Sequence, residues 1–145
     1  MKNYAVIAVV ACIAFVSLAA VPGHGQALIK ADVPFDFCVG RGVLPAGEYS
    51  IGWIGWSSQS LALSSGVRWV EIMTPMTTES RTDFETPKLV FHRYGNEYFL
   101  AEIWTSNDNA VRKLADHPRE RQLAKAGMSP QVAVVYSASP STGGN

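Results

Sequence analysis

The sequence predicts a mainly β protein: a single antiparallel β-sandwich or β-barrel of about seven or eight strands, with one short C-terminal helix. Three observations predict this class. Apolar and polar residues alternate over short runs from residue 33 onward, which is the period of a half-buried strand. Glycines and prolines, 12 and 8 in number, separate those runs as turn residues do. The runs show no strand–helix–strand rhythm, and this argues against a parallel sheet.

The first predicted strand covers residues 33–39, in which valines and phenylalanines alternate with smaller or polar residues. Pro34 has no N–H for a strand partner, so this strand is expected to begin there or to lie at a sheet edge. A β-turn follows at residues 44–47, where Pro45 presets the φ angle.

Three more strands are predicted before the middle of the chain. Residues 49–53 alternate again, and Gly52 suggests a bulge or a bend in that strand. Residues 61–63 and 67–73 are the third and fourth strands, joined by a Ser-Ser-Gly turn at 64–66. Residues 74–87 are then expected to form a loop that is either functional or mobile, because it exceeds the usual length of about 4–6 residues.

The clearest hairpin spans residues 88–104, with Gly95 and Asn96 as a two-residue turn that places Tyr94 opposite Glu97. One face then carries Leu89, Phe91, Arg93, Tyr98, Leu100, Glu102 and Trp104. The other face carries Val90, His92, Tyr94, Phe99, Ala101 and Ile103. Neither face is plainly polar, so both are expected to be covered. One cover is the opposite sheet, and the other is a helix, a long loop or a partner chain.

The C-terminal helix is predicted at residues 118–126, because proline is favoured at a first helical position. Asp116 or His117 is the expected N-cap, Gly127 the terminator and Leu123 the apolar anchor.

A last strand is predicted at residues 131–136, and the Ser/Gly/Pro tail at 138–145 is expected to be disordered. The β-rich domain therefore occupies residues 28–137, which is long enough for one hydrophobic core.

Residues 1–27 have the layout of a secretory signal peptide: a positive start, an apolar run of 17 residues at 5–21 and small residues at the end. Cleavage is expected near Gly25 or Ala27, which makes the protein exported, either periplasmic or secreted. Two alternatives stay open. The apolar run is near the lower length of a membrane-spanning helix, so the segment can also be an uncleaved anchor. Acylation at Cys12 would make the chain a lipoprotein.

Net charge and cysteine content limit the partners. Removal of Lys2 with the leader changes 12 basic and 12 acidic residues to 11 and 12, a net charge of −1 with histidine neutral. Near neutrality argues against nucleic acid, which needs a concentrated basic face, and against docking on anionic membranes. Cys38 alone survives cleavage, so no intrachain disulfide is possible. This thiol is expected to be buried in a strand or to pair between chains.

No pattern of metal ligands, phosphate-binding glycines, dinucleotide binding or a serine nucleophile is present, so the sequence predicts no metal, no cofactor and no catalytic residue. The best polar group on the hairpin consists of His92, Arg93 and Glu102. With a two-residue turn, His92 and Glu102 point to opposite faces and cannot act as an acid–base pair. Arg93 is expected to stack on Tyr98 and to pair with a carboxylate.

Aromatic residues offer a second candidate, since flat rings stack on sugars and apolar ligands. Trp53 and Trp69 are expected to fill the core, whereas Trp56 lies at a predicted loop tip. The predicted ligand-binding residues are therefore Trp56, Tyr49 and Arg93.

Three motifs carry a resemblance to other proteins: Val-Pro-Phe-Asp-Phe at 33–37, Leu-Pro-Ala-Gly-Glu-Tyr at 44–49 and Tyr-Gly-Asn-Glu-Tyr-Phe-Leu at 94–100. With them, the chain resembles a group of short exported bacterial proteins of unknown function. The likeness covers most of the predicted mature chain. It implies a β-rich exported domain and brings no activity, cofactor or catalytic residue.

The sequence thus favours a non-enzymatic protein of the periplasm or cell surface that binds an envelope protein, a glycan or an apolar ligand. A structural subunit of an envelope assembly, including a homo-oligomer, is a related interpretation suggested by Cys38 and the doubly apolar hairpin. The alternative is a small hydrolase with a site around His92 and Glu102.

Overall fold

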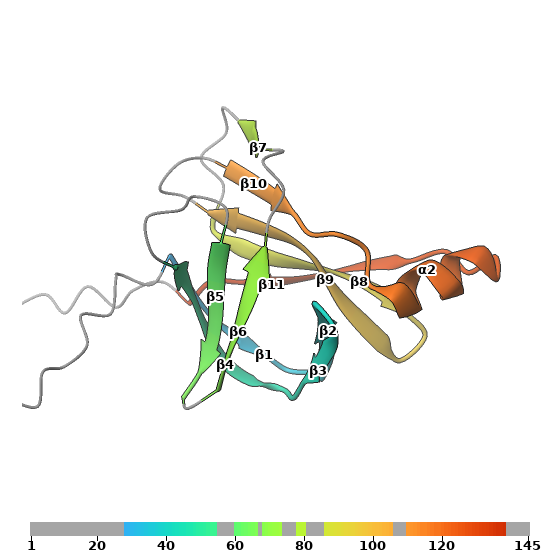
Figure 1. The fold of residues 1–145 in the computed structure, drawn as a ribbon, viewed down its shortest axis with the longest axis horizontal. Coiled ribbons are helices and arrows are strands. Elements are labelled where there is room, and N and C mark those ends of the chain that lie inside the picture. Colours follow the sequence, from blue (N-terminus) through green and yellow to red (C-terminus); the bar gives the residue numbers. More distant parts are fainter. Residues whose placement is uncertain are drawn as a thin grey trace, which may run out of the picture.

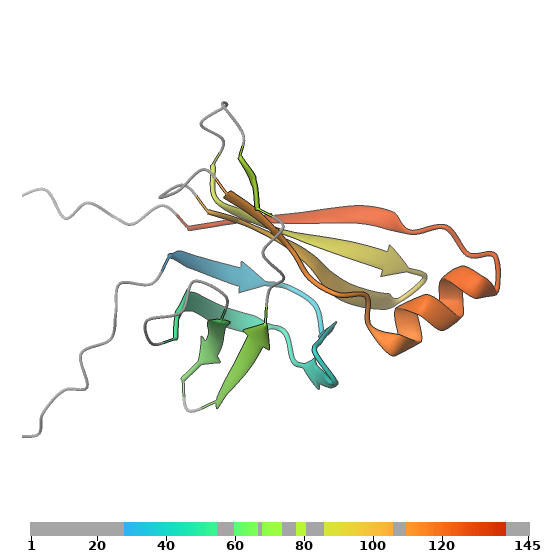
Figure 2. The ribbon, with the colours of Figure 1, turned by 45° about the horizontal axis from the view of Figure 1, so that its top comes forward.

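The computed structural model describes residues 28–54, 60–66, 68–73, 78–80, 86–105 and 110–138. Within these residues the chain forms two β-sheets packed face to face and one helix that projects beyond them (Figure 1, Figure 2). The mainly β class predicted from the sequence is confirmed. Neither sheet closes on itself within the described ranges, so the architecture is a sandwich.

The smaller sheet contains four antiparallel strands in the order β1–β4–β5–β6. Their bounds are β1 Ile29–Val33, β4 Gly47–Trp53, β5 Ser60–Ser65 and β6 Arg68–Met73. Alternate side chains of a strand point to opposite faces, and the apolar set here points inward. The buried residues are Ile29, Ala31, Val33, Tyr49, Ile51, Leu61, Leu63 and Ile72.

The larger sheet has the order β11–β8–β9–β10–β7. The bounds are β7 Thr78–Ser80, β8 Lys88–Tyr94, β9 Glu97–Thr105, β10 Ala110–Lys113 and β11 Gln131–Tyr136. A small hairpin of β2 (Phe37–Val39) and β3 (Gly42–Leu44) joins this sheet, where β2 pairs with β9 in parallel. The described residues thus contain more strands than the seven or eight predicted, because the three-residue strands β2, β3 and β7 are too short to show alternation.

The predicted strand at 33–39 is wrong as a single strand. β1 ends at Val33 in the smaller sheet and β2 begins at Phe37 in the larger one, so the chain crosses between sheets at residues 34–36. Pro34, with no N–H and a fixed φ, occupies the crossing rather than a strand. Phe35 stacks on Tyr98 with ring centroids 3.7 Å apart and meets Phe91 edge to face at 5.1 Å, so the crossing packs on the β8–β9 hairpin.

The hairpin of β8 and β9 has the predicted turn, with Tyr94 opposite Glu97 and Gly95 at φ 62°. The predicted assignment of side chains to the two faces is correct only near the turn. The register shifts between Val90 and Phe91, so that Phe91 faces Leu100 but Val90 faces Glu102. Ala101 is the extra residue of a β-bulge.

The bulge reverses the faces of β9 beyond Ala101. Leu89 lies opposite Ile103, where the regular register predicts Glu102, and both apolar side chains are fully buried. Glu102 instead joins the outer face of the larger sheet. A charged side chain is thereby kept out of the core, where its desolvation would be costly.

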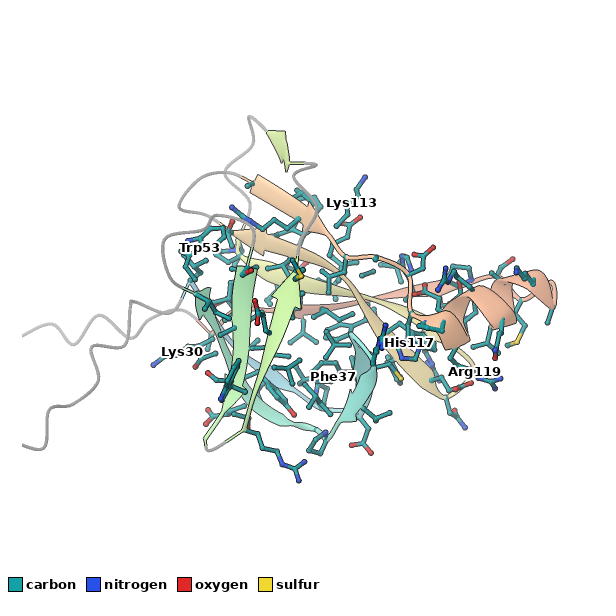
Figure 3. All side chains as sticks on the ribbon, in the orientation of Figure 1. Lys30, Phe37, Trp53, Lys113, His117 and Arg119 are labelled. Atoms are coloured by element: carbon teal, nitrogen blue, oxygen red, sulfur yellow. The ribbon has the colours of Figure 1, made fainter. Side chains whose placement is uncertain are left out.

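The core lies between the two sheets and is continuous. Its largest fully buried members include Phe37 and Phe91, whose rings meet edge to face at 5.3 Å. Figure 3 shows Phe37 among the side chains that fill the space between the sheets. Packing of this core supplies the main driving force for folding.

Helix α2 spans Pro118–Lys125, one residue shorter than predicted, and covers the turn end of the hairpin (Figure 2). His117 is the N-cap, and its Nδ1 accepts a hydrogen bond from the Arg119 N–H at 3.1 Å. Gly127, at φ 83°, donates its N–H to the Ala124 carbonyl as the predicted terminator. Leu123 packs on Tyr94 and Phe99. A helix is therefore one cover of the hairpin's outer face, as expected.

Other expectations were less accurate. Gly52 lies in regular register opposite Ala62, without the predicted bulge. Trp69, expected in the core, is 66% exposed because it lies on the outward face of the edge strand β6. Within the predicted loop at 74–87, residues 78–80 form β7.

The predicted signal peptide and residues 139–145 lie outside the described residues. Ala138, assigned to the disordered tail by the sequence, donates its N–H to the Lys30 carbonyl at 2.8 Å. Among the described residues, no helix has the length and apolarity needed to cross a membrane.

Candidate functional site

The three predicted ligand-binding residues do not come together. Tyr49 lies in β4 of the smaller sheet and Arg93 lies in β8 of the larger sheet. Trp56 lies outside the described residues. The cavity beside Tyr49 is lined by residues within the range 44–70 and does not include Arg93.

Tyr49 is a core residue. Its hydroxyl donates a hydrogen bond to the Pro45 carbonyl across the turn. Burial raises the pKa of this phenol, and the negative charge of Asp36 raises it further. The adjoining cavity measures about 50 Å³, far below the roughly 300–1,000 Å³ of small-molecule sites. Tyr49 therefore stabilises the turn.

Arg93 has the predicted aromatic partner. Its guanidinium carbon lies 5.4 Å from the centroid of the Tyr98 ring, and its Nε donates to the Gly95 carbonyl at 2.7 Å. No carboxylate partner for Arg93 is found among the described residues. Both contacts tie the hairpin turn to the strands, so Arg93 has a structural role.

Trp53, expected to fill the core, is half-buried and packs against its margin, and it has a cationic neighbour that the sequence did not predict. The Arg112 guanidinium carbon lies 4.4 Å from the centroid of the Trp53 ring. Arg112 itself is buried, and its Nη1 donates to the Thr105 hydroxyl at 2.7 Å. This cluster joins the two sheets, because β4 belongs to one and β10 to the other.

The most chemically distinctive group lies between α2 and the hairpin, centred on His92. Its Nδ1 is 2.6 Å from Oε1 of Glu120, the third residue of α2. The Glu120 side chain is 7% exposed and that of His92 is 31% exposed. The sequence missed Glu120 because it lies 28 residues from His92. One signal was available: Glu120 is three residues before Leu123, so both lie on the same face of the helix.

Two further contacts position Glu120. Arg119 donates from Nε and Nη2 to the two carboxylate oxygens of Glu97, at 3.1 and 3.2 Å, and so fixes the helix start to the hairpin turn. Figure 3 shows His117 and Arg119 at this helix start, beside the end of the hairpin. The apolar contact of Leu123 fixes the rest of the helix. Glu120 is thereby held over β8.

Tyr94 lies beside the His92–Glu120 pair and forms a hydrogen bond with Glu120. It is buried, and burial raises the pKa of its phenol. The charges of Glu120 and Asp116, and a hydrogen bond with Glu120, raise that pKa further. An open cleft of about 350 Å³ follows this group along the helix. It is lined by His92, Tyr94, Asp116, Glu120, Arg121, Ala124 and Lys125.

Glu102, the acid that the sequence placed beside His92 in the hydrolase hypothesis, has another partner. Its Oε2 accepts a hydrogen bond from Nε1 of Trp104 at 2.8 Å. The bulge at Ala101 puts Glu102 on the same face as His92, contrary to the predicted opposite faces. Glu120 nevertheless provides the carboxylate that contacts the imidazole.

Cys38 is the other potentially reactive side chain near this group. Cys38 is half-buried against Tyr94 and Phe99, and burial followed by the charge of Glu97 raises the pKa of its thiol, which lowers the fraction of reactive thiolate at neutral pH. Within the described ranges, no group of three or more His, Cys, Asp or Glu side chains could hold a metal ion.

A second feature lies on the edge strand β11. Val132, Val134 and Tyr136 are 68%, 40% and 60% exposed. They share the outer face of the larger sheet with His92, Val90 and Lys88, their respective neighbours on β8. Three consecutive outward positions of one strand are therefore large, apolar and exposed to solvent. The sequence predicted this strand but not its exposed edge position.

Comparison with known proteins adds no family assignment: no protein-family model, no curated protein and no solved structure matches the chain.

Proposed function

We propose that this protein is an exported, non-enzymatic binding or structural protein of the bacterial periplasm or cell surface, and that it works through β11. The exposed row of Val132, Val134 and Tyr136 carries the proposal. A water-exposed run of large apolar side chains is a common mark of an interaction surface. The signal-like residues 1–27 support export.

The comparison with other exposed apolar residues supports β11 as the surface. Val43 and Met128 are single exposed residues on β3 and after α2, and single ones need no explanation. On β6, Trp69 and Met73 are separated by Glu71 on the same face. Only on β11, among the described strands, do three consecutive positions of one face combine apolar character with exposure.

Native mass spectrometry of the protein purified from its own envelope fraction tests this proposal. The expected result is the mass of a chain whose first residue is Gln26 or Leu28, together with a bound molecule or a stable multimer. A Val134→Lys variant should lose that association, and Val43→Lys should keep it. A bare monomer for the unmodified chain, or recovery of the protein from the cytoplasmic fraction in place of the envelope fraction with residues 1–27 still attached, contradicts the proposal.

One observation favours a second candidate, a small hydrolase. A histidine held by a carboxylate at 2.6 Å beside an open cleft has the arrangement of an oriented general base. Hydrolysis of a panel of activated esters tests it. An enzyme should lose turnover in His92→Ala and Glu120→Gln but keep its fold, and Glu102→Gln should be neutral because Glu102 contacts Trp104 instead. Absence of turnover in the unmodified protein rejects this candidate.

A further inference from the structure

The edge strand β11 lacks the features that keep sheet edges from pairing. Exposed edges are usually protected by charged side chains, proline or a bulge. β1 carries Lys30 and Asp32, and β6 carries Arg68 and Glu71. β11 has the sequence Gln-Val-Ala-Val-Val-Tyr and pairs with β8 in regular register over all six residues. It therefore has no charge, no proline and no bulge.

The backbone hydrogen bonds that follow β11 show which of its groups face outward. The Ser137 N–H donates to the Pro87 carbonyl, on the β8 side. The Ala138 N–H points the other way and donates to the Lys30 carbonyl of β1. Because backbone groups alternate sides along a strand, the N–H and C=O groups of Val132, Val134 and Tyr136 face the free edge. These are also the residues with exposed apolar side chains.

We propose that two copies of this chain associate by antiparallel pairing of β11 with β11 of the partner subunit, with the two-fold axis at Val134. The inference rests on the proposed function, because it names the occupant of the same surface. Val134 then exchanges both backbone hydrogen bonds with Val134 of the partner subunit. Val132 faces the partner's Tyr136, and Tyr136 faces the partner's Val132.

Self-complementarity of β11 identifies a second copy as the occupant. In this register every pair on the outer face is apolar, and aromatic–β-branched pairs are among the favourable cross-strand combinations. On the inner face Ala133 meets the partner's Val135, again without a charge. An isologous two-fold contact requires one surface to match itself, and an uncharged strand with this symmetry does.

The ends of the pairing also agree with the structure. Beyond Tyr136 the next outward N–H belongs to Ala138, which is already bonded to Lys30. The residue that would lie opposite Ala138 is the partner's Pro130, which has no N–H to donate. Among the described residues, the outward backbone groups of Val132, Val134 and Tyr136 have no hydrogen-bond partner, and these are the groups that the two-fold pairing uses.

Sedimentation equilibrium of the purified, processed protein tests the proposal. The unmodified chain should be a dimer. Val134→Lys should raise the dissociation constant on the order of tenfold or more, because the two-fold axis brings both lysines face to face. The matched control Val43→Lys changes a residue of 66% exposure on β3 and should leave the dimer unchanged. A monomeric unmodified chain overturns the proposal. So does a Val134→Lys variant whose dimer has the same dissociation constant as that of the unmodified chain.

Disulfide trapping tests the register. In a Cys38→Ala background, Val134→Cys should give a crosslinked dimer on oxidation. Directly opposed Cα atoms lie roughly 5.5 Å apart in a hydrogen-bonded pair, which is within disulfide reach. Val132→Cys should not crosslink, because the two copies of residue 132 lie roughly 14 Å apart along the strands. Equal trapping at both positions contradicts this register.

The two proposals fail in different ways. A purified chain that is monomeric, but is retained by the envelope fraction through Val134, shows that another molecule occupies β11. That result rejects the second copy and leaves the proposed function standing. A chain that is monomeric and free of the envelope rejects both.

Discussion

Removing the hydrogen bond between His92 and Glu120 should weaken the attachment of α2 to the hairpin by a measurable coupling energy. The perturbation is a double-mutant cycle of His92→Ala, Glu120→Ala and both together. Such a cycle separates the interaction of the pair from the cost of truncating each side chain. The two atoms are 2.6 Å apart, and no other carboxylate of the described residues is recorded in contact with this imidazole.

The exposure of the two side chains sets the expected magnitude. A hydrogen bond to a charged group contributes about 1.5–3 kcal/mol when buried, and an exposed ion pair contributes about 0.2–1 kcal/mol. Glu120 is 7% exposed but His92 is 31% exposed, so the pair lies between these limits. We expect a coupling of about 1–2 kcal/mol.

Urea unfolding of the four proteins at neutral pH provides the assay. The control cycle uses Arg119 and Glu97, which are linked by two hydrogen bonds but are 50% and 42% exposed. Their coupling should be smaller than that of His92 and Glu120, because solvent screens it. A His92–Glu120 coupling no larger than that of the control refutes the assignment of this pair as the main polar attachment of α2.

Three further predictions concern the same end of the molecule. Leu123→Ala should lower the free energy of unfolding by about 2–3 kcal/mol, because this leucine is buried on Tyr94 and Phe99. The control Met128→Ala, at an exposed site, should change it by less than about 0.5 kcal/mol. Equal effects of the two substitutions in urea unfolding contradict the packing of Leu123. The raised pKa of Tyr94 means that its neutral phenol contributes stability below the ordinary phenol pKa of about 10, and that this stability is lost as pH rises through the folded value. The Tyr94→Phe variant should therefore lose less stability than the unmodified chain when pH is raised past 10. If the unfolding free energies of the two proteins fall equally with pH, the raised pKa of Tyr94 is contradicted. Alkylation of Cys38 should have its pH midpoint above that of an unperturbed thiol, and Glu97→Gln should lower that midpoint; a midpoint unmoved by Glu97→Gln contradicts the electrostatic contribution.

Local patterns in the sequence were enough to predict the hairpin turn and the helix. Gly95 and Asn96 define the turn by backbone preference, and Pro118 with Gly127 defines both helix ends by the same kind of local chemistry. Both features depend on residues close together in the chain. Such features can be derived before the fold is known.

Features that depend on distant residues could not be derived in this way. The bulge at Ala101 lies in an apolar run with no glycine or proline to mark it, and the only local sign of it is that the regular register would turn Glu102 toward the core. The contact of Glu120 with His92 depends on how α2 returns to β8. The exposure of Trp69 and of Val132 follows from the edge positions of β6 and β11, which strand order decides and side-chain alternation does not.

Residue-resolved amide hydrogen exchange at increasing protein concentration tests the central claim, that β11 pairs with a second copy through its free edge, most directly. In dilute protein, the amides of Val132, Val134 and Tyr136 should exchange faster than those of Ala133 and Val135, which face β8. Raising the concentration should slow exchange at the first three amides and leave the other two unchanged. Exchange at Val132, Val134 and Tyr136 that stays equally fast at every concentration contradicts the claim.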